Sequence, residues 1–154
     1  MDDITQLDMI SDLFRFRQIT LCQQLMAKMA DLKKKGATDY EINMMGTSNL
    51  IQDLAQVYGE RRIVDSCIDF LTTIKTPLDR KVMDCVFRVF GLDCIKRDLS
   101  FYITEQAISP KAASNMLIAQ NSLIKTMSAN IEDLLKLLNV PDELLYAPLA
   151  QDYV

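Results

Sequence analysis

Histidine and tryptophan are absent from this 154-residue sequence, and glycine and proline are scarce, with four residues of each. Without histidine, the chain cannot itself supply a histidine-ligated zinc site or a histidine general base. The four glycines lie far apart, so the sequence has no glycine-rich loop of the kind that holds phosphate groups. These absences exclude several common classes of active site, and the scarcity of glycine and proline favours long helices over a turn-rich β fold.

Charge and hydrophobic patterning exclude two further classes of protein. The formal net charge is −4, so nothing indicates the clustered positive surface that nucleic acids need. No apolar run approaches the roughly 20 residues that cross a bilayer, and residues 1–3 are acidic at their second and third positions, where a secretory signal is basic. We therefore expect residues 1–154 to form a single soluble domain that is not secreted, binds no nucleic acid and does not span a membrane.

The side chains most often used in chemistry are scattered. The cysteines have no metal-type spacing and are predicted to be free, buried thiols. They are Cys22, Cys67, Cys85 and Cys94. The acidic pairs Glu132-Asp133 and Asp142-Glu143 are adjacent in sequence, so their carboxylates point in different directions on a helix. We predict no metal ligand and no catalytic residue in this chain, and the sequence assigns no cofactor-binding residue.

The segment 78–103 predicts a long helix with almost no polar face. Within 82–95, apolar side chains point in nearly every direction around a 3.6-residue period, which is typical of a buried helix. The only polar stripe on this helix consists of Lys81, Asp84 and Arg88. Gly91 follows on that stripe and has two interpretations: a neighbouring helix backbone approaches it closely, or it continues an exposed face.

Signals at helix ends place the remaining elements. A first helix is predicted from about Asp12 to Lys35, with Ser11 or Asp12 as its cap and Gly36 as its left-handed stop. A polar connection follows over 37–46. A second helix then runs from Thr47 or Ser48 to about Ile74. Its apolar seam is interrupted by Arg61, which is interpreted either as a side chain at the edge or as one buried against an acid or ligand.

A threonine or serine followed by proline marks the start of each of the two later helices, because proline is well tolerated at the first helical position. Thr76-Pro77 starts the central helix, which is predicted to end near Ile103 or Glu105. Ser109-Pro110 starts a fourth helix that continues to Leu138. The predicted fold is all-α, an antiparallel up-and-down four-helix bundle with a short C-terminal helical turn over 142–146 and an extended tail over 147–150.

Four stretches of the sequence together resemble the C-terminal helical domain of acyl-CoA oxidases over about residues 10–154. Phe14-Arg15-Phe16-Arg17 is similar to the stretch that opens that domain. Val89-Phe90-Gly91-Leu92 with Ile95, Asp98 and Phe101-Tyr102 is similar to one of its helices. Ile108-Ser109-Pro110 is similar to the next helix start, and Val140-Pro141-Asp142-Glu143-Leu144-Leu145 with Ala147-Pro148-Leu149-Ala150 to its closing segment.

The resemblance implies an FAD-dependent enzyme that converts acyl-CoA and O2 to trans-2-enoyl-CoA and H2O2 in peroxisomal β-oxidation. The flavin domain and the catalytic glutamate of the family lie upstream, so no catalytic residue carries over. The implied partners are those upstream domains or a second subunit of a homodimer. Many relatives have a histidine near the position of Tyr58, and many end in a Ser-Lys-Leu-type peroxisomal address, whereas this sequence ends in Asp152-Tyr153-Val154. The alternative is a helical bundle that serves as a non-catalytic interaction or regulatory module.

Overall fold

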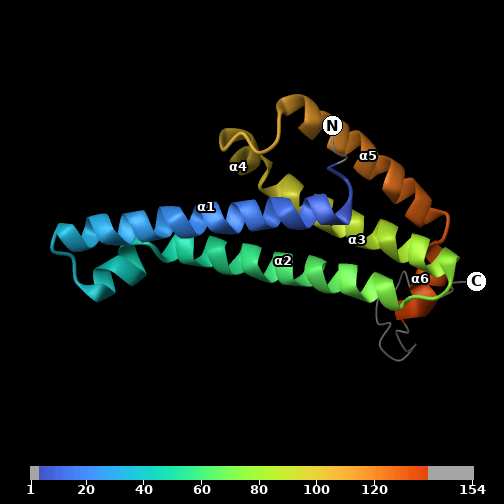
Figure 1. Cartoon of the computed structure of the whole chain (residues 1–154), viewed down its shortest axis with the longest axis horizontal. Coiled ribbons are helices and arrows are strands. Elements are labelled where there is room, and N and C mark those ends of the chain that lie inside the picture. The colour runs from blue at the N-terminus through green and yellow to red at the C-terminus, as the bar shows by residue number, and fades with distance from the viewer. Residues whose placement is uncertain (1–3, 139–154) are drawn as a thin grey trace, which may run out of the picture.

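A computed structural model describes residues 4–138, and every regular element within that range is helical (Figure 1). The elements are α1 (Leu7–Lys34), the π-helical turn η1 (Glu41–Gly46), α2 (Ser48–Thr73), α3 (Pro77–Arg97), α4 (Leu99–Thr104), α5 (Pro110–Ser128) and α6 (Ile131–Leu138). The predicted all-α class is confirmed. The predicted turn at 142–146 and tail at 147–150 lie outside the described residues. None of the helices in this range is long and apolar enough to cross a lipid bilayer.

The long helices α1, α2, α3 and α5 alternate in direction along the chain (Figure 1). α1 and α2 form a long antiparallel hairpin, α3 runs back across both of them, and α5 packs along α3. This arrangement is compatible with the predicted up-and-down bundle. Because successive long helices are joined by short connections, each can cover the apolar face of its neighbour.

Several helix ends follow local sequence signals. Pro77 and Pro110 occupy first helical positions, and the Ser109 hydroxyl accepts a hydrogen bond from the Ala112 N–H at 3.1 Å. Gly36 has a left-handed φ of 80° after the end of α1, a conformation that glycine adopts without the steric cost of a Cβ atom. These predictions are confirmed.

The predicted cap of the first helix is wrong. α1 begins at Leu7, with Gln6 at its N-cap, so Ser11 and Asp12 lie inside the helix. The Ser11 hydroxyl donates instead to Asp65 of α2 at 2.6 Å. The helix extends further back because Leu7 and Ile10 are buried in the core, and this tertiary contact outweighs the local capping signal.

The central helix is also shorter than predicted. It ends at Arg97, where Asp98 takes a non-helical backbone conformation with φ −110° and ψ 23° before α4 begins. The predicted fourth helix is likewise divided, into α5 and α6. The Asn130 amide donates to the Thr126 carbonyl at 2.9 Å, which satisfies one of the carbonyl groups left free at the end of α5.

The core is richest where α1, α2, the second half of α3, α4 and the first half of α5 meet. Its fully buried side chains include Ile10, Phe14, Val57, Val64, Leu92, Ile95, Tyr102 and Met116. The prediction of a buried central helix holds for this second half and is wrong for the first half, where Leu78 is 63% exposed and Val82 and Val86 are partly exposed. No described element covers that end of α3 on all sides.

The polar stripe of α3 is partly covered rather than open to solvent. The Arg88 side chain is only 17% exposed, and it donates two hydrogen bonds of 2.6 Å, to the carbonyl and to the hydroxyl oxygen of Thr5. Gly91 is buried, and a Cβ atom there would lie 2.6 Å from Cγ2 of Ile10. The exposed-face interpretation of Gly91 is therefore wrong. Gly91 is closely packed, but its near neighbour is a side chain of α1 and not the helix backbone that the other interpretation named.

Candidate functional site

The first part of the candidate site is Arg17, which α1 carries into the interior. Phe14 is fully buried, and a residue three positions later lies on the same helix face. The Arg17 side chain is consequently only 5% exposed. Its Nη1 donates to Oδ2 of Asp98 at 2.5 Å, and it lies 3.8 Å from Oε2 of Glu60 on α2.

Glu60 joins this pair to α3. Its side chain is 9% exposed, and Oε1 accepts hydrogen bonds of 2.9 Å from Nη2 of Arg97 and from Nε2 of Gln56. We refer to Arg17, Glu60, Arg97 and Asp98 as the ion cluster. Its two guanidinium groups and two carboxylates balance, which is the condition under which charges are tolerated in a protein interior.

Two aromatic residues of α4 lie beside the ion cluster. The guanidinium carbon of Arg17 lies 5.7 Å from the centre of the Phe101 ring, within the range of a cation–π interaction. Phe101 meets Tyr102 edge to face, with 5.6 Å between ring centres. Tyr102 is fully buried, and its hydroxyl has no hydrogen-bond partner among residues 4–138. Burial raises the pKa of Tyr102, and the charge of Arg17 offsets only part of that rise.

Cys94 closes the cluster on the α3 side. Its sulfur accepts a hydrogen bond from Nη2 of Arg97 at 3.0 Å, and the residue is 1% exposed. Burial raises the pKa of the Cys94 thiol, as does the negative charge of Glu60, against the opposing effect of the Arg97 hydrogen bond. A neutral, buried thiol is a poor nucleophile.

The ion cluster is suited to holding helices in position and offers no reactive group. Both carboxylates are held by guanidinium groups, and the neighbouring thiol and phenol are neutral near pH 7 because burial raises the pKa of each. The contacts tie together α1, α2 and the junction between α3 and α4. We therefore assign the ion cluster the task of fixing these elements relative to one another.

A second polar group connects α1 and α2 directly beside the ion cluster, because Gln18 and Arg61 follow Arg17 and Glu60 in the sequence. Arg61 donates from Nη1 to Oε1 of Gln18 at 2.9 Å, and its Nε lies 3.4 Å from Oδ2 of Asp65. The Arg61 side chain is 23% exposed. Of the two interpretations of Arg61, the structure supports pairing with an acid, in a partly buried position between the helices.

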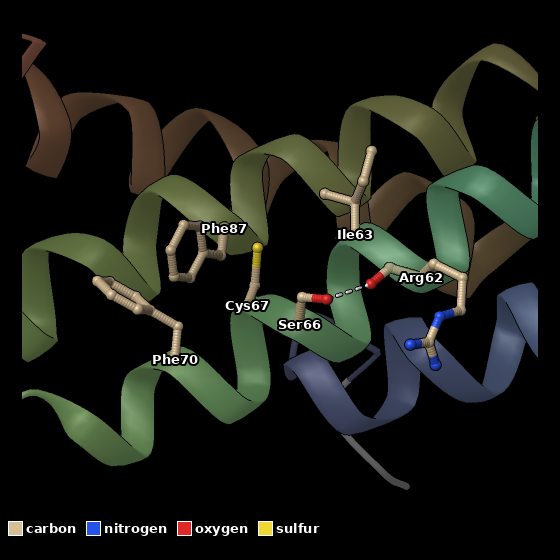
Figure 2. A pocket seen from close by; sticks show the side chains of 6 residues that line it. All are labelled: Arg62, Ile63, Ser66, Cys67, Phe70 and Phe87. Carbon is tan, nitrogen blue, oxygen red and sulfur yellow. Dashed lines mark hydrogen bonds between the residues drawn. The ribbon is translucent and has the colours of Figure 1, made fainter.

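Two shallow hollows lie on the surface of α2. The hollow against α1 has a volume of about 500 Å³ and is lined by Gln18, Ile19, Cys22, Ile51, Leu54, Ala55 and Tyr58. The α2–α3 hollow has a volume of about 510 Å³ and is lined by Arg62, Ile63, Ser66, Cys67, Phe70 and Phe87 (Figure 2). Phe70 and Phe87 meet edge to face with 6.2 Å between their ring centres. Neither lining includes a carboxylate that could act as a base.

The described residues do not by themselves fit a flavin. Both hollows are open and mostly apolar, and neither contains a glycine turn that would bring backbone N–H groups to a phosphate. At the start of α5, the Ala112 N–H is already bonded to Ser109. Within residues 4–138, no three acidic, histidine or cysteine side chains are close enough to hold a metal ion.

The ion cluster was not predicted from the sequence, although the stretches singled out there contain two of its residues. Arg17 and Asp98 both belong to the stretches that carry the family resemblance, yet nothing local indicates that they meet. Glu60 lies three residues after the buried Val57 and four before the buried Val64, so its helical spacing was the available signal. The prediction that this chain supplies no catalytic residue or metal ligand stays a prediction.

Comparison with known proteins adds a family. The model of a family described as acyl-CoA oxidase matches residues 6–152, a range that includes the whole ion cluster. A search of curated proteins finds no match, and a search of solved structures finds none either. The matched range agrees with the four stretches of resemblance in the sequence.

Proposed function

The chain belongs to the acyl-CoA oxidase family, whose C-terminal helical domain it matches, and we propose that it serves as that domain in an FAD-dependent oxidase or oxidase-like protein. The complete protein would convert acyl-CoA and O2 to trans-2-enoyl-CoA and H2O2. FAD would supply the redox chemistry from upstream parts of the enzyme, so we expect no FAD on residues 1–154 alone. Family membership is also our reason to propose fatty-acid β-oxidation in peroxisomes.

Within that protein, we assign these residues a structural and dimerising role as a single helical domain. The ion pair between Arg17 and Asp98 is the observation that carries this proposal. It brings together two stretches of the family resemblance in a buried contact without an accessible nucleophile. A contact of this kind supports a packed domain that holds its shape beside a catalytic one.

Exposed apolar side chains support the proposed partners, which are the upstream domains or a second subunit of a homodimer, with acyl-CoA bound by the complete enzyme. Those on α1 and α2 include Ile19, Met26, Ile51, Tyr58, Ile63 and Phe70, each between 38% and 59% exposed. Ile19, Ile51 and Tyr58 lie at the hollow against α1, and Ile63 and Phe70 at the α2–α3 hollow. Groups of exposed apolar side chains are typical of surfaces that another protein covers.

The same exposed side chains would also suit the alternative, a non-catalytic interaction or regulatory module. The DNA immediately upstream of the codon for Met1 distinguishes the two proposals. An open reading frame that encodes a flavin-binding β domain supports the oxidase. A stop codon or promoter directly upstream would contradict the oxidase and support the module.

A further inference from the structure

The outward face of α2 carries an apolar row at the edge of the α2–α3 hollow. Ile63 and Phe70 are each 50% exposed and lie seven residues apart, so they share one face of the helix. Phe87 of α3 supports Phe70 edge to face from behind (Figure 2). Phe70 is thus held in place by Phe87, and both Ile63 and Phe70 remain half open to solvent.

A charged row runs parallel to the apolar one. Arg62 and Asp69 are exposed, lie seven residues apart and form no ion pair with any residue in the described part of the chain. With 3.6 residues per turn, both fall on the same side of Ser66, while the apolar row falls on its other side. One helix therefore presents opposite charges at either end of a short row.

The line between the two rows is made of small residues, again at a spacing of seven: Gly59, Ser66 and Thr73. The Ser66 hydroxyl donates to the Arg62 carbonyl at 2.8 Å, as Figure 2 shows, and the Thr73 hydroxyl donates to the Phe70 carbonyl at 2.7 Å. Each hydroxyl is already satisfied by its own helix. Covering this line would therefore leave neither hydroxyl without a hydrogen bond.

We propose that this face of α2 binds the same face of a second copy of the chain, antiparallel, with a two-fold axis near Ser66. An antiparallel copy places Arg62 beside Asp69 of the partner subunit and Ile63 beside Phe70 of the partner subunit, each within one residue, or about 1.5 Å of helix rise. The two-fold axis makes each contact occur twice, because both copies use the same patch of residues.

The charges select this partner and this direction. Arg62 and Asp69 are complementary to themselves only when the second helix runs the opposite way. A parallel copy in register would place the charged row of each chain against the apolar row of the other, which would bury both charges without a partner. The small residues at the centre allow the two copies of α2 to approach closely. Each copy can then cover the exposed Ile63 and Phe70 side chains of the other.

This contact rests on the proposed function only in that a second subunit is one of its proposed partners. The test measures self-association of the full 154-residue chain by sedimentation velocity, with Arg62→Asp, Asp69→Arg and the double reversal. Each single reversal sets like charges against each other twice, and we expect it to raise the dissociation constant about tenfold. The double reversal restores both pairs, so its dissociation constant should return to within about threefold of the parent value.

Matched controls use an ion pair elsewhere on the surface. Asp31 and Lys35 near the end of α1 are 57% and 68% exposed and pair at 2.6 Å. Asp31→Lys and Lys35→Asp should leave the dissociation constant unchanged. Circular dichroism of every variant should report the parent helical content, because all these positions lie on the surface.

A covalent readout checks the position of the axis. Mild oxidation of Ser66→Cys should give a cross-linked dimer, since residues on a two-fold axis approach their own copies closely enough for a disulfide. Ser100→Cys, on the exposed side of α4, should not cross-link.

A strictly monomeric parent chain would overturn the proposed contact, and so would single reversals that leave the dissociation constant unchanged. A double reversal with a dissociation constant about a hundredfold higher than that of the parent would also overturn it. Such results leave the oxidase proposal standing, because that proposal is decided by the upstream reading frame. A stop codon upstream would contradict the oxidase proposal, and the α2 contact would still be decided by sedimentation velocity and cross-linking.

Discussion

Arg17 of α1 and Asp98 at the α3–α4 junction form an ion pair with 2.5 Å between Nη1 and Oδ2, although 81 positions separate them in sequence. The pair explains why the predicted central helix ends early. A continuous helix would give Asp98 a helical backbone, whereas the observed turn holds its carboxylate on Arg17. Glu60 and Phe101 then enclose the guanidinium from two further directions.

Removing Arg17 should destabilise the chain strongly. Arg17→Ala leaves the partly buried carboxylate of Asp98 without its cation and leaves the buried carboxylate of Glu60 with Arg97 alone, a loss that typically costs about 3 kcal/mol or more. Urea unfolding measures the change. Arg15→Ala is the matched control, because Arg15 is two residues away and 57% exposed, and we expect it to change the free energy of unfolding by less than about 0.5 kcal/mol. Equal effects of the two substitutions would contradict the assignment of the ion cluster.

Gly91 should tolerate no side chain. Gly91→Ala places a methyl group 2.6 Å from Cγ2 of Ile10, and Ile10 is branched at Cβ and fully buried, so it cannot swing aside. We expect a loss of roughly 1 kcal/mol for Gly91→Ala and roughly 1 to 3 kcal/mol for Gly91→Leu.

Gly59 provides the control, because a Cβ atom there meets nothing within 4 Å. Gly59→Ala should stabilise the monomer by about 0.4 to 1 kcal/mol, measured by urea unfolding at low concentration. The Ile10→Ala background should reduce the cost of Gly91→Ala, since the obstructing methyl is gone. A Gly91→Leu variant as stable as the parent would sink the close-packing interpretation.

Burial gives the chain a stability that weakens at alkaline pH. The pKa of Cys94 is raised above its ordinary 9.0 and that of Tyr102 above its ordinary 10.0, so the folded chain keeps these protons after the unfolded chain begins to lose them. The free energy of unfolding should therefore be unaffected by these groups below about pH 9 and should fall as the pH rises above it.

Tyr102→Phe separates the two contributions. The variant loses no hydrogen bond, because the hydroxyl has no partner among the described residues, so at pH 7 it should be at least as stable as the parent. Above pH 10 its stability should fall less steeply than that of the parent. Tyr58→Phe, at a residue 53% exposed, serves as the control. A Tyr102→Phe variant with the parent's alkaline profile would contradict the burial of this phenol.

The purified 154-residue chain should carry no flavin. Its two surface hollows on α2 are shallow and lack a phosphate-binding turn, and we propose that FAD is bound by upstream parts of the complete protein. The absorbance spectrum of the folded protein checks this. Stoichiometric flavin bands that persist after gel filtration would contradict the expectation.

Sequence reasoning succeeded where a signal is local. Pro77, Pro110 and Gly36 each constrain their own backbone, so the helix ends beside them could be placed without knowledge of the fold. The break at Asp98 has no proline or glycine beside it and depends on Arg17, which is distant in sequence. Gly91 lies between these cases: its sequence position suggested close packing, but only the structure identifies Ile10 as the neighbour.

Periodicity also says which face is apolar but not what covers it. The central helix was predicted to be buried on most sides. The second half of α3 is, because Ile10 of α1 packs on Gly91 and Glu60 of α2 pairs with Arg97. Leu78 at the other end is exposed. Which part of a helix is buried depends on where the neighbouring helices lie, and the residue pattern of one helix does not give their positions.

The central claim is that this chain is the C-terminal domain of an oxidase, and acyl-CoA-dependent H2O2 formation tests it most directly. The measurement compares the product of the complete reading frame with the same product lacking residues 6–152. We predict a flavin-containing protein that forms H2O2 only when acyl-CoA is added, with activity and subunit association both lost on deletion. A complete product that carries no flavin and forms no H2O2 with acyl-CoA, or one whose activity is unchanged by the deletion, would contradict the claim.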